Sequence, residues 1–322
     1  MTNIPTPAEL LKQLPREKRF DAYTFNCLSE KGQSLPPLKK IWGNYILDGS
    51  LIHFPSLRGS GKSLLMYQVC LAVATGQNSF LGEKIEAEGK TLYLDFEMPE
   101  RFLRRRSAQL SANAPFTIKE NGDKLIVFNS RHTFLSEFPV IIKLIKQENP
   151  ILIVVDNLRT AARGMNTNSS KDMAEFFSVL AAIREIHNTA IIIIDHLRKG
   201  TKSLLSDSDL QSGSGAKTDL VDGDFLLRHS CQHKDLRILK RIKSRLAEES
   251  NSVKLIKLNP DTLWFELVEE DVNESEHIGL SEIQDKEELI DMAKDLQEQG
   301  KSLSEIAAIL KKGKTTIHRW LS

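Results

Sequence analysis

The sequence lacks the features of several large classes of protein. Its three cysteines, Cys27, Cys70 and Cys231, are isolated and form no C-x-x-C pair. They are expected to be reduced thiols that pack as small hydrophobic groups rather than parts of a metal site or a disulfide framework. No apolar run approaches the about 20 residues that span a bilayer, and the N-terminus has neither a basic start nor the apolar stretch of a signal peptide. We therefore expect a cytoplasmic protein without a membrane partner.

The chain also lacks an excess of charge of either sign. It carries 44 Lys and Arg against 43 Asp and Glu, a net charge of +1. A globally basic nucleic-acid-binding protein is thereby excluded, and any binding to nucleic acid must use local patches. With 322 residues, 40% hydrophobic and 27% charged, the composition is that of a globular protein, and the length fits two domains or one large domain with an appendage.

Alternating strand and helix patterns begin at Leu51. Short apolar runs suited to buried strands occupy Leu51–Phe54, Thr91–Phe96, Leu125–Phe128, Ile151–Val155 and Ala190–Ile194. Helical patterns lie between them, at Ser63–Ala74, Glu100–Leu110 and Lys171–Ile186. Strands separated by helices predict right-handed crossovers and a parallel sheet covered on both faces. The expected fold class is therefore α/β.

The pattern changes after Asp195. Four further strands are predicted, which resemble an antiparallel extension of the sheet: Asp224–Leu227, Leu236–Lys243, Val253–Leu258 and Leu263–Val268. We divide the chain into an N-terminal arm (1–45), an α/β domain (46–268), an acidic solvated linker (269–284) and a small all-helical domain (285–322).

A phosphate-binding loop is predicted between the first strand and the first helix. The residues from Ser56 to Ser63, S-L-R-G-S-G-K-S, follow a strand and open a helix, as a P-loop requires. Backbone amides curl around the phosphates, the lysine (Lys62) reaches the β- and γ-phosphates, and the Ser63 hydroxyl ligates magnesium. One departure is Ser56, preceded by Pro55, where the motif has its first glycine; we expect a different start of the loop and intact binding. The alternative is a glycine-rich turn without a ligand.

ATP and Mg²⁺ are the expected ligands, although no base-reading motif separates ATP from GTP. The residues expected to bind the nucleotide are Arg58, Gly59, Ser60, Gly61, Lys62, Ser63 and Leu64.

Acidic residues end two further strands. Asp156 follows a buried run and is expected to hold magnesium together with Ser63. Asp95 and Glu97 end the neighbouring strand and are spaced to face the same side. Glu97 is the candidate general base for the attacking water, with a surface carboxylate as the alternative. His196 ends a third strand and is either a γ-phosphate contact or a histidine satisfied by local backbone groups.

Together these motifs resemble the RecA-like ATPases, and within them the RepA-type hexameric replicative helicases of plasmids and mobile elements, often described as AAA-family ATPases. The phrases L-Y-L-D-F-E (Leu92–Glu97) and D-N-L-R (Asp156–Arg159) carry the likeness, which covers roughly residues 40–268. The resemblance implies a ring with nucleotide between subunits, Glu97 as base, Asp156 as the magnesium acid and His196 as the γ-phosphate sensor.

The resemblance also implies contacts beyond one subunit. Lys243 and Arg245 match a K-x-R signature whose arginine enters the neighbouring subunit's site; a basic strand face is the alternative. Two loops, Arg159–Lys171 and Arg198–Lys217, would face the central channel, where Lys199 and Lys202 track single-stranded DNA. Mobile solvent loops are an equally tenable interpretation.

Three short helices are predicted at the C-terminus: Glu287–Gln299, Ser304–Leu310 and Lys314–Leu321. The last two resemble a helix-turn-helix, in which the final helix would present Lys314, Thr315, Thr316 and Arg319 to duplex DNA. A protein-docking module is the alternative.

The hypothesis that unites these features is a ring-forming RecA-like ATPase that acts on DNA as a helicase or translocase of a mobile element. It would be a homo-oligomer, and a hexamer is expected. The rivals are a DNA-bound regulatory ATPase that does not unwind, and a scaffold that binds nucleotide without hydrolysing it.

Overall fold

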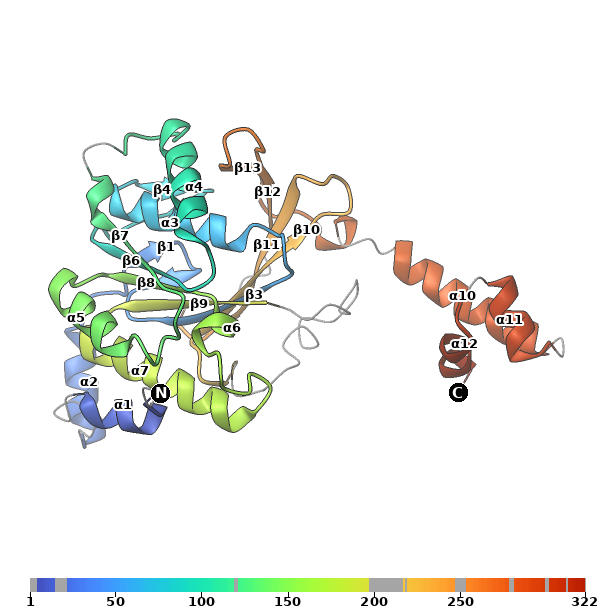
Figure 1. Ribbon diagram of the computed structural model, residues 1–322, viewed down its shortest axis with the longest axis horizontal. Helices are drawn as coiled ribbons and strands as arrows, with labels where there is room; N and C mark the ends of the chain where they lie inside the picture. Colours follow the sequence, from blue (N-terminus) through green and yellow to red (C-terminus); the bar gives the residue numbers. More distant parts are fainter. Residues whose placement is uncertain are drawn as a thin grey trace.

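The computed structural model describes residues 5–14, 22–118, 121–196, 217, 219–246, 253–277, 281–298, 301–310 and 312–321. Figure 1 shows a central sheet with helices on both sides and a separate group of three helices at the C-terminal end. Among the described residues, no helix has the length and apolar character needed to cross a bilayer.

The central sheet has nine strands in the order β13-β12-β11-β10-β3-β9-β8-β6-β7. Neighbouring strands from β10 to β7 pair in parallel. These six strands are β3 (Leu51–Ser56), β6 (Thr91–Asp95), β7 (Leu125–Asn129), β8 (Leu152–Asp156), β9 (Ala190–His196) and β10 (Gly223–His229). The predicted α/β class with a parallel sheet is thus confirmed.

Each face of this sheet is covered by its own set of helices. Alternate residues of one strand belong to different cores: Ile192 and Ile194 of β9 pack with α3 (Lys62–Ala74) and α4 (Glu100–Ala112). Ile191 and Ile193 pack instead on the other face. That face is covered by α5 (Phe138–Glu148), α7 (Ser170–His187) and α1 (Pro7–Gln13). The near-continuous apolar strands follow from burial on both faces.

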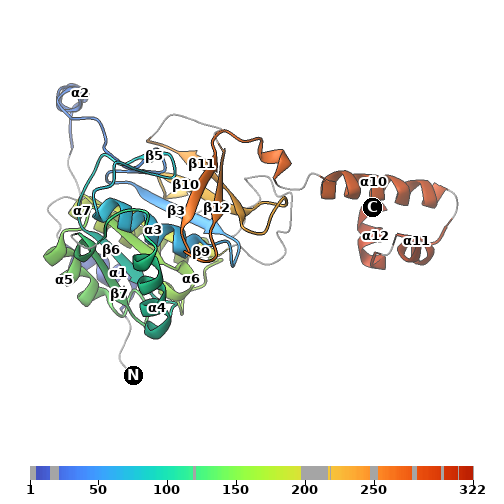
Figure 2. The ribbon, with the colours of Figure 1, turned by 90° about the horizontal axis from the view of Figure 1, so that it is seen from above.

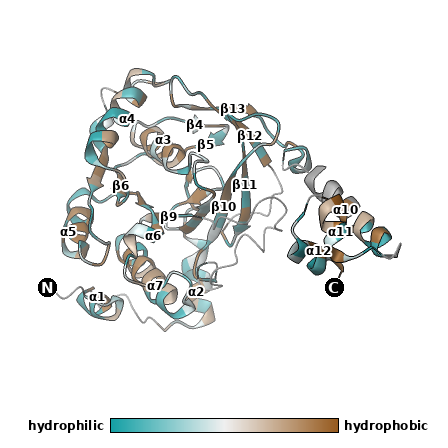
Figure 3. Ribbon diagram, turned by 45° about the vertical axis from the view of Figure 1, so that its right-hand side comes forward, coloured by the Kyte–Doolittle hydropathy of each residue, from teal (hydrophilic) through white to brown (hydrophobic). Residues whose placement is uncertain are grey.

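Helix α3, which begins at the P-loop lysine, is itself enclosed. Every residue of the helix except Ser63 is buried, and Figure 3 shows it as a largely hydrophobic helix beside β4 and β5. Two short hairpins lie around it, β1 (Lys40–Trp42) with β2 (Ile46–Leu47) and β4 (Ser79–Phe80) with β5 (Glu83–Lys84). A helix that is apolar on all sides has to be buried on all sides, which fixes the direction of its N-terminus.

The antiparallel extension begins one strand later than the sequence indicates. The structure pairs β10 antiparallel with β11, as predicted, but in parallel with β3, so β10 also continues the parallel sheet. The antiparallel strands are β11 (Leu236–Ser244), β12 (Val253–Leu258) and β13 (Phe265–Glu269). Residues 197–222 connect β9 to β10, a length that permits a crossover connection between parallel strands.

The predicted N-terminal arm is in part a piece of the core. Leu10 of α1 is fully buried against the α7 side of the sheet, and Ile41 and Trp42 of β1 are fully buried on the α3 side. The helix α2 (Phe25–Gln33) between them has no buried residue, as expected for an arm. The sequence pattern did not predict the packing of α1, because this helix has only a few apolar positions and their partners lie on helices that are distant in the sequence.

The acidic stretch after β13 also differs from the solvated linker that was predicted. Its residues 269–277 return to the antiparallel strands through η2 (Glu274–Glu276). Glu274 pairs with Lys240 at 2.6 Å, and His277 is buried with its Nδ1 3.0 Å from the Ser230 hydroxyl. Glu274 therefore neutralises a lysine of β11, and this part of the stretch packs on the sheet.

The C-terminal helices form a core of their own. They are α10 (Ser281–Glu298), α11 (Leu303–Ile309) and α12 (Lys314–Leu321), around Ala293, Ile306, Leu310 and Ile317. Figure 2 shows them as a group set apart from the sheet. Helix α10 begins earlier than predicted. Two short elements complete the description, η1 (Gly122–Lys124) and α6 (Leu158–Ala161).

Candidate functional site

The candidate site lies where the parallel strands end. In the aligned strands Ser56 of β3 is opposite His196 of β9, and Asp95 of β6 is opposite Asp156 of β8. Because β9 lies between β3 and β8, His196 is placed between the P-loop strand and the strand that ends in Asp156. The carboxyl ends of strands in an open parallel sheet are the usual place for a ligand.

The P-loop has the backbone geometry that its glycines permit. Gly59 and Gly61 have positive φ angles, 79° and 96°, and Gly61 is the N-cap of α3. A Cβ atom on Gly61 would lie 2.8 Å from Cζ of Phe265, so the ring of β13 packs directly on the loop. Glycine is required here for both its φ angle and its lack of a side chain.

Ser56, the departure from the motif, is accommodated by hydrogen bonds rather than by glycine-like backbone. It is fully buried and is the last residue of β3. Its hydroxyl donates to the Leu227 carbonyl at 2.7 Å and contacts the hydroxyl of Ser60. The loop therefore starts from an extended strand that is fastened to β10, which agrees with the expected change at the start of the loop.

Lys62 is buried, and its Nζ lies 3.3 Å from the Leu57 carbonyl, within the loop itself. Burial lowers the pKa of this ammonium, an effect opposed by the carboxylates of Asp156 and Glu97. A buried cation at a helix N-terminus, with acids on the strands beside it, is arranged to meet an anion.

Asp156 is buried beside the first turn of α3. Its Oδ2 accepts a hydrogen bond of 2.6 Å from the Tyr93 hydroxyl, and the Ser63 hydroxyl also donates to the carboxylate. Burial raises its pKa, against these two hydrogen bonds. Its Oδ1 is buried without a hydrogen-bond partner among the described residues. An unpaired carboxylate oxygen next to a serine hydroxyl fits Mg²⁺, which prefers hard oxygen ligands.

Glu97, Asn157 and His196 come together from three strand ends. The Asn157 side-chain amide donates to Glu97 Oε2 and lies 3.0 Å from His196 Nε2, which is 3.4 Å from the same carboxylate oxygen. The hydrogen bond with His196 lowers the pKa of Glu97, so the carboxylate is ionised as a base must be. Asn157 was not predicted as a site residue, although a polar residue directly after Asp156 was a signal.

Asp95 does not share the direction of Glu97. Its Oδ1 accepts the backbone N–H groups of Glu97 at 2.9 Å and Met98 at 2.7 Å. Burial is the main cause that raises its pKa to about 6. The expectation that both acids face the same side is therefore wrong, because Asp95 turns back to hold the loop that carries Glu97. Both hydrogen bonds of the Asp95 carboxylate oxygen are therefore to backbone groups.

Two side chains, Arg237 of β11 and Gln68 of α3, connect the antiparallel strands to the P-loop and to α3, and neither was predicted. The buried Arg237 donates from Nε to the Ser60 carbonyl at 2.9 Å. Gln68 of α3 is fully buried and bonds the backbone of β13, accepting from the Phe265 N–H at 2.9 Å and donating to the Leu263 carbonyl at 2.7 Å. The extension of the sheet thus holds the loop and the helix behind it.

The remaining predicted residues lie away from this cluster. Lys243 and Arg245 are at the end of β11 that pairs with the start of β10, the opposite end from the P-loop. Arg245 is exposed and donates to the Asp219 carbonyl at 2.6 Å. Lys199 and Lys202 lie outside the described residues. On α12, Lys314, Thr315 and Arg319 are exposed and Thr316 is half-buried.

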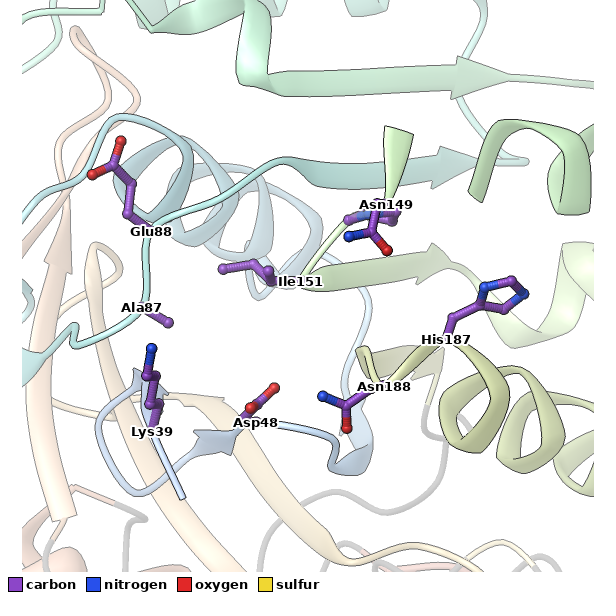
Figure 4. A pocket seen from close by; sticks show the side chains of 9 residues that line it. Lys39, Asp48, Ala87, Glu88, Asn149, Ile151, His187 and Asn188 are labelled. Atoms are coloured by element: carbon purple, nitrogen blue, oxygen red, sulfur yellow. The ribbon is translucent and has the colours of Figure 1, made fainter. Parts of the chain in front are cut away.

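A pocket of about 310 Å³ lies at the other edge of the sheet, near the amino ends of β8 and β9. Figure 4 shows the residues that line it, which include Asp48, Glu88, Asn149 and Asn188. None of the residues expected to bind nucleotide lines it, so it is separate from the candidate site.

Comparison with known proteins supports the same assignment of fold. A KaiC-like protein from the hyperthermophilic archaeon Pyrococcus horikoshii is similar in structure, with a TM-score of 0.53 and 15% sequence identity over 73% of this chain and 100% of that chain. Its likeness establishes a RecA-like fold. No curated protein matches the sequence. Residues 16–202, more than half of the chain, match the family described as the AAA domain. The geometry of the P-loop and the match over this length lead to one conclusion: the chain belongs to the AAA domain family of P-loop proteins.

Proposed function

We propose that this protein is an ATPase of the RecA-like type that assembles as a ring, with a hexamer expected, and acts on DNA. The observation that carries the proposal is the convergence of Lys62, Asp156, Glu97 and His196 at the ends of adjacent strands. A glycine-rich turn would need Lys62 and Asp156 at most. Hydrolysis needs in addition a base and a polar contact for the terminal phosphate.

The side chains have distinct roles in the proposed reaction. The Lys62 ammonium binds the β- and γ-phosphate oxygens, and the P-loop amides with the α3 N-terminus surround them. Glu97 orients the attacking water and accepts its proton, while Asn157 and His196 hold the carboxylate in place. Ser63 and Asp156 would hold Mg²⁺, which supplies positive charge to the phosphate oxygens when it is bound.

The ring is part of the proposal because Arg245, the arginine of the K-x-R pair, does not lie at the candidate site of its own subunit. Arg245 is exposed at the far end of β11, which suits a residue that acts on a neighbouring subunit. Replacing Arg245 by Ala is expected to leave nucleotide binding intact and to stop hydrolysis.

Two parts of the chain are proposed to contact DNA. Lys199 and Lys202 would contact a single strand in the channel of the ring. The helices α11 and α12 would act as a helix-turn-helix, with the exposed Lys314 and Arg319 at the duplex. A helicase or translocase of a mobile element is the activity that best unites a ring with both contacts. The location of the protein in the cytoplasm stays a prediction.

The first experiment is to measure ATP turnover by the full chain without DNA, with single strands and with duplex. The Lys62→Ala variant is the control, and its turnover should be lost. Stimulation by single strands supports a translocating ring and leads to a fork-unwinding assay. Turnover that survives in Lys62→Ala contradicts the assignment of the P-loop.

A second candidate function is a regulatory ATPase that binds a specific duplex site and does not unwind it. The separate core of α10–α12 favours it, because a helical unit of this kind can bind DNA without a ring. Slow turnover that no DNA stimulates, together with tight binding to one duplex sequence, would favour this function over the motor. A scaffold that binds nucleotide without hydrolysis predicts no turnover at all.

A further inference from the structure

A buried histidine lies behind the candidate site and has no part in the proposed reaction. His53 is in the middle of β3 and is 3% exposed. Its neighbours along the strand, Ile52 and Phe54, are buried apolar residues, and the rings of His53 and of Phe177 on α7 are in a T-shaped arrangement. A polar side chain at such a position requires hydrogen-bond partners.

Both ring nitrogens of His53 face carboxylate oxygens. Nδ1 is 2.8 Å from Asp224 Oδ1 on β10, and Nε2 is 3.3 Å from Asp195 Oδ2 on β9. Ionised carboxylates only accept hydrogen bonds, so both nitrogens must donate, and only the imidazolium can do this. The geometry therefore assigns a buried positive charge between two buried negative charges. The same two carboxylates raise the pKa of His53 to about 9, against the effect of burial.

One of these carboxylates connects the histidine to the candidate site. Asp195 Oδ1 accepts the backbone N–H of His196 at 2.7 Å, while its Oδ2 also accepts from Lys217 Nζ at 2.9 Å. The His196 ring in turn contacts Asn157 and Glu97. His53 is thus connected to the proposed base through Asp195, which accepts the His196 N–H, and through the His196 ring, which contacts Glu97.

We propose that His53, as an imidazolium between Asp195 and Asp224, is a positioning residue of the ATPase: it fixes the backbone of His196 and through it the geometry of Glu97. This inference rests on the proposed ATPase function. It follows because a neutral side chain at position 53 removes the cation that joins Asp195 to Asp224, and leaves Asp195 held by Lys217 alone. Asp195 would then rotate or draw away, and the N–H of His196 would lose its acceptor.

The test is His53→Gln in the full chain, with His277→Gln as the matched control. His277 is also a buried histidine with a hydrogen-bonded ring, but its ring partner is Ser230 rather than Asp195 or Asp224. His53→Gln is expected to lower kcat by about tenfold to a hundredfold with KM for ATP within about twofold of wild type, whereas His277→Gln keeps the wild-type kcat. A folded His53→Gln variant with wild-type kcat overturns the proposal.

A second variant separates positioning from folding. The charged groups that face the ring are Asp224 on β10, Asp195 on β9 and, behind Asp195, Lys217. Asp224→Asn keeps an acceptor for Nδ1 but removes one charge, so His53 should lose its proton at a lower pH. The alkaline limb of the kcat–pH profile should then move down by about one unit or more. An unmoved limb contradicts the proposal, since a purely structural histidine predicts no such shift.

Failure of the ATPase proposal gives a different result. If the wild-type protein has no turnover, the imidazole ¹⁵N spectrum of histidine-labelled protein still decides the inference. His53 should show two protonated nitrogens at pH 8, and the His196 signal, assigned with His196→Gln, should shift in His53→Gln. A neutral His53 at pH 8, or an unshifted His196 signal, overturns the positioning role whatever the turnover.

Discussion

At the scale of single residues, the candidate site depends on side chains that make two different hydrogen bonds, one as acceptor and one as donor. Asn157 is the clearest case. Its Oδ1 accepts the Thr160 N–H at 3.2 Å and caps α6, while its Nδ2 donates to Glu97. One residue thus starts a helix and holds the proposed base, which explains why an asparagine, with both an acceptor and donors, occupies the position.

Replacing Asn157 by Asp separates these two functions. The carboxylate can still cap α6, but it cannot donate to Glu97 and places a second negative charge beside it. We expect a folded protein whose kcat falls by about a hundredfold or more, as for loss of a well-placed base. Steady-state ATP turnover measures this. Asn166→Asp, at an exposed residue away from the cluster, is the control, and equal turnover in both variants would show that Glu97 does not need Asn157.

Protonation of His53 gives a pH-dependent contribution to stability. Its pKa is about 9 in the folded protein and about 6.5 in an unfolded chain. Between these values the folded state binds a proton that the unfolded state has released, so stability falls as pH rises. The contribution, about 3 kcal/mol by the size of the shift, is complete below about pH 6.5 and lost above about pH 9. Urea unfolding at several pH values should show this decline in wild type and a flatter curve in His53→Gln; parallel curves would mean that His53 is neutral in the fold.

The sequence predicted those site residues that local patterns mark. Lys62 and Ser63 lie in a loop with a fixed spacing, and Asp156 ends an apolar run, so each is visible within ten residues of sequence. Tyr93 and His53 were missed because what gives them a role is a partner far along the chain. The Tyr93 hydroxyl meets a carboxylate 63 residues away, and His53 meets two that are 142 and 171 residues away. Only the order of the strands brings them together.

At the scale of elements, the P-loop and α3 depend on strands that follow them by more than 150 residues. Phe265 packs on Gly61, Arg237 holds the Ser60 carbonyl, and Gln68 bonds the backbone of β13. This dependence could not be predicted from periodicity, which detects a strand without its neighbour. The same limit led to β10 being placed in the antiparallel extension, since the residues of a strand read alike in either direction.

Replacing Gln68 by Leu tests how strongly β13 holds α3. Leucine has a similar size, but the variant leaves the Phe265 N–H and the Leu263 carbonyl without their partner. Because an unsatisfied buried polar group costs about 1–3 kcal/mol, we expect a loss of about 2–4 kcal/mol in the free energy of unfolding. Gln77→Leu, at a half-buried residue with one side-chain hydrogen bond, should cost less than about 1 kcal/mol. Chemical denaturation of both variants gives the comparison, and equal losses would show that the Gln68 hydrogen bonds add little.

At the scale of the whole molecule, the structure joins a RecA-like sheet to a separate group of helices. The two parts differ in what holds them. The sheet is covered on both faces by two large cores, whereas α10–α12 share a small one. Both parts could be predicted from the sequence, because each has its own periodic pattern. Where the sheet domain ends was harder to predict, since charge composition alone did not show that Glu274 pairs with Lys240.

A charge reversal on α12 tests whether this second part meets DNA. Lys314 is exposed at the first position of the helix, where a glutamate is favoured by the helix dipole, so Lys314→Glu should not unfold it. If Lys314 contacts a phosphate, duplex affinity should fall about tenfold or more. The slope of log Kd against log salt concentration should decrease by about one, the value for one lost phosphate contact. Fluorescence anisotropy at several salt concentrations measures both. Lys294→Glu is the matched control, because it makes the same change of charge at an exposed residue of α10. Equal losses of affinity in the two variants would mean that net charge acts rather than a contact of α12, and no loss in either would return the helices to a protein-docking role.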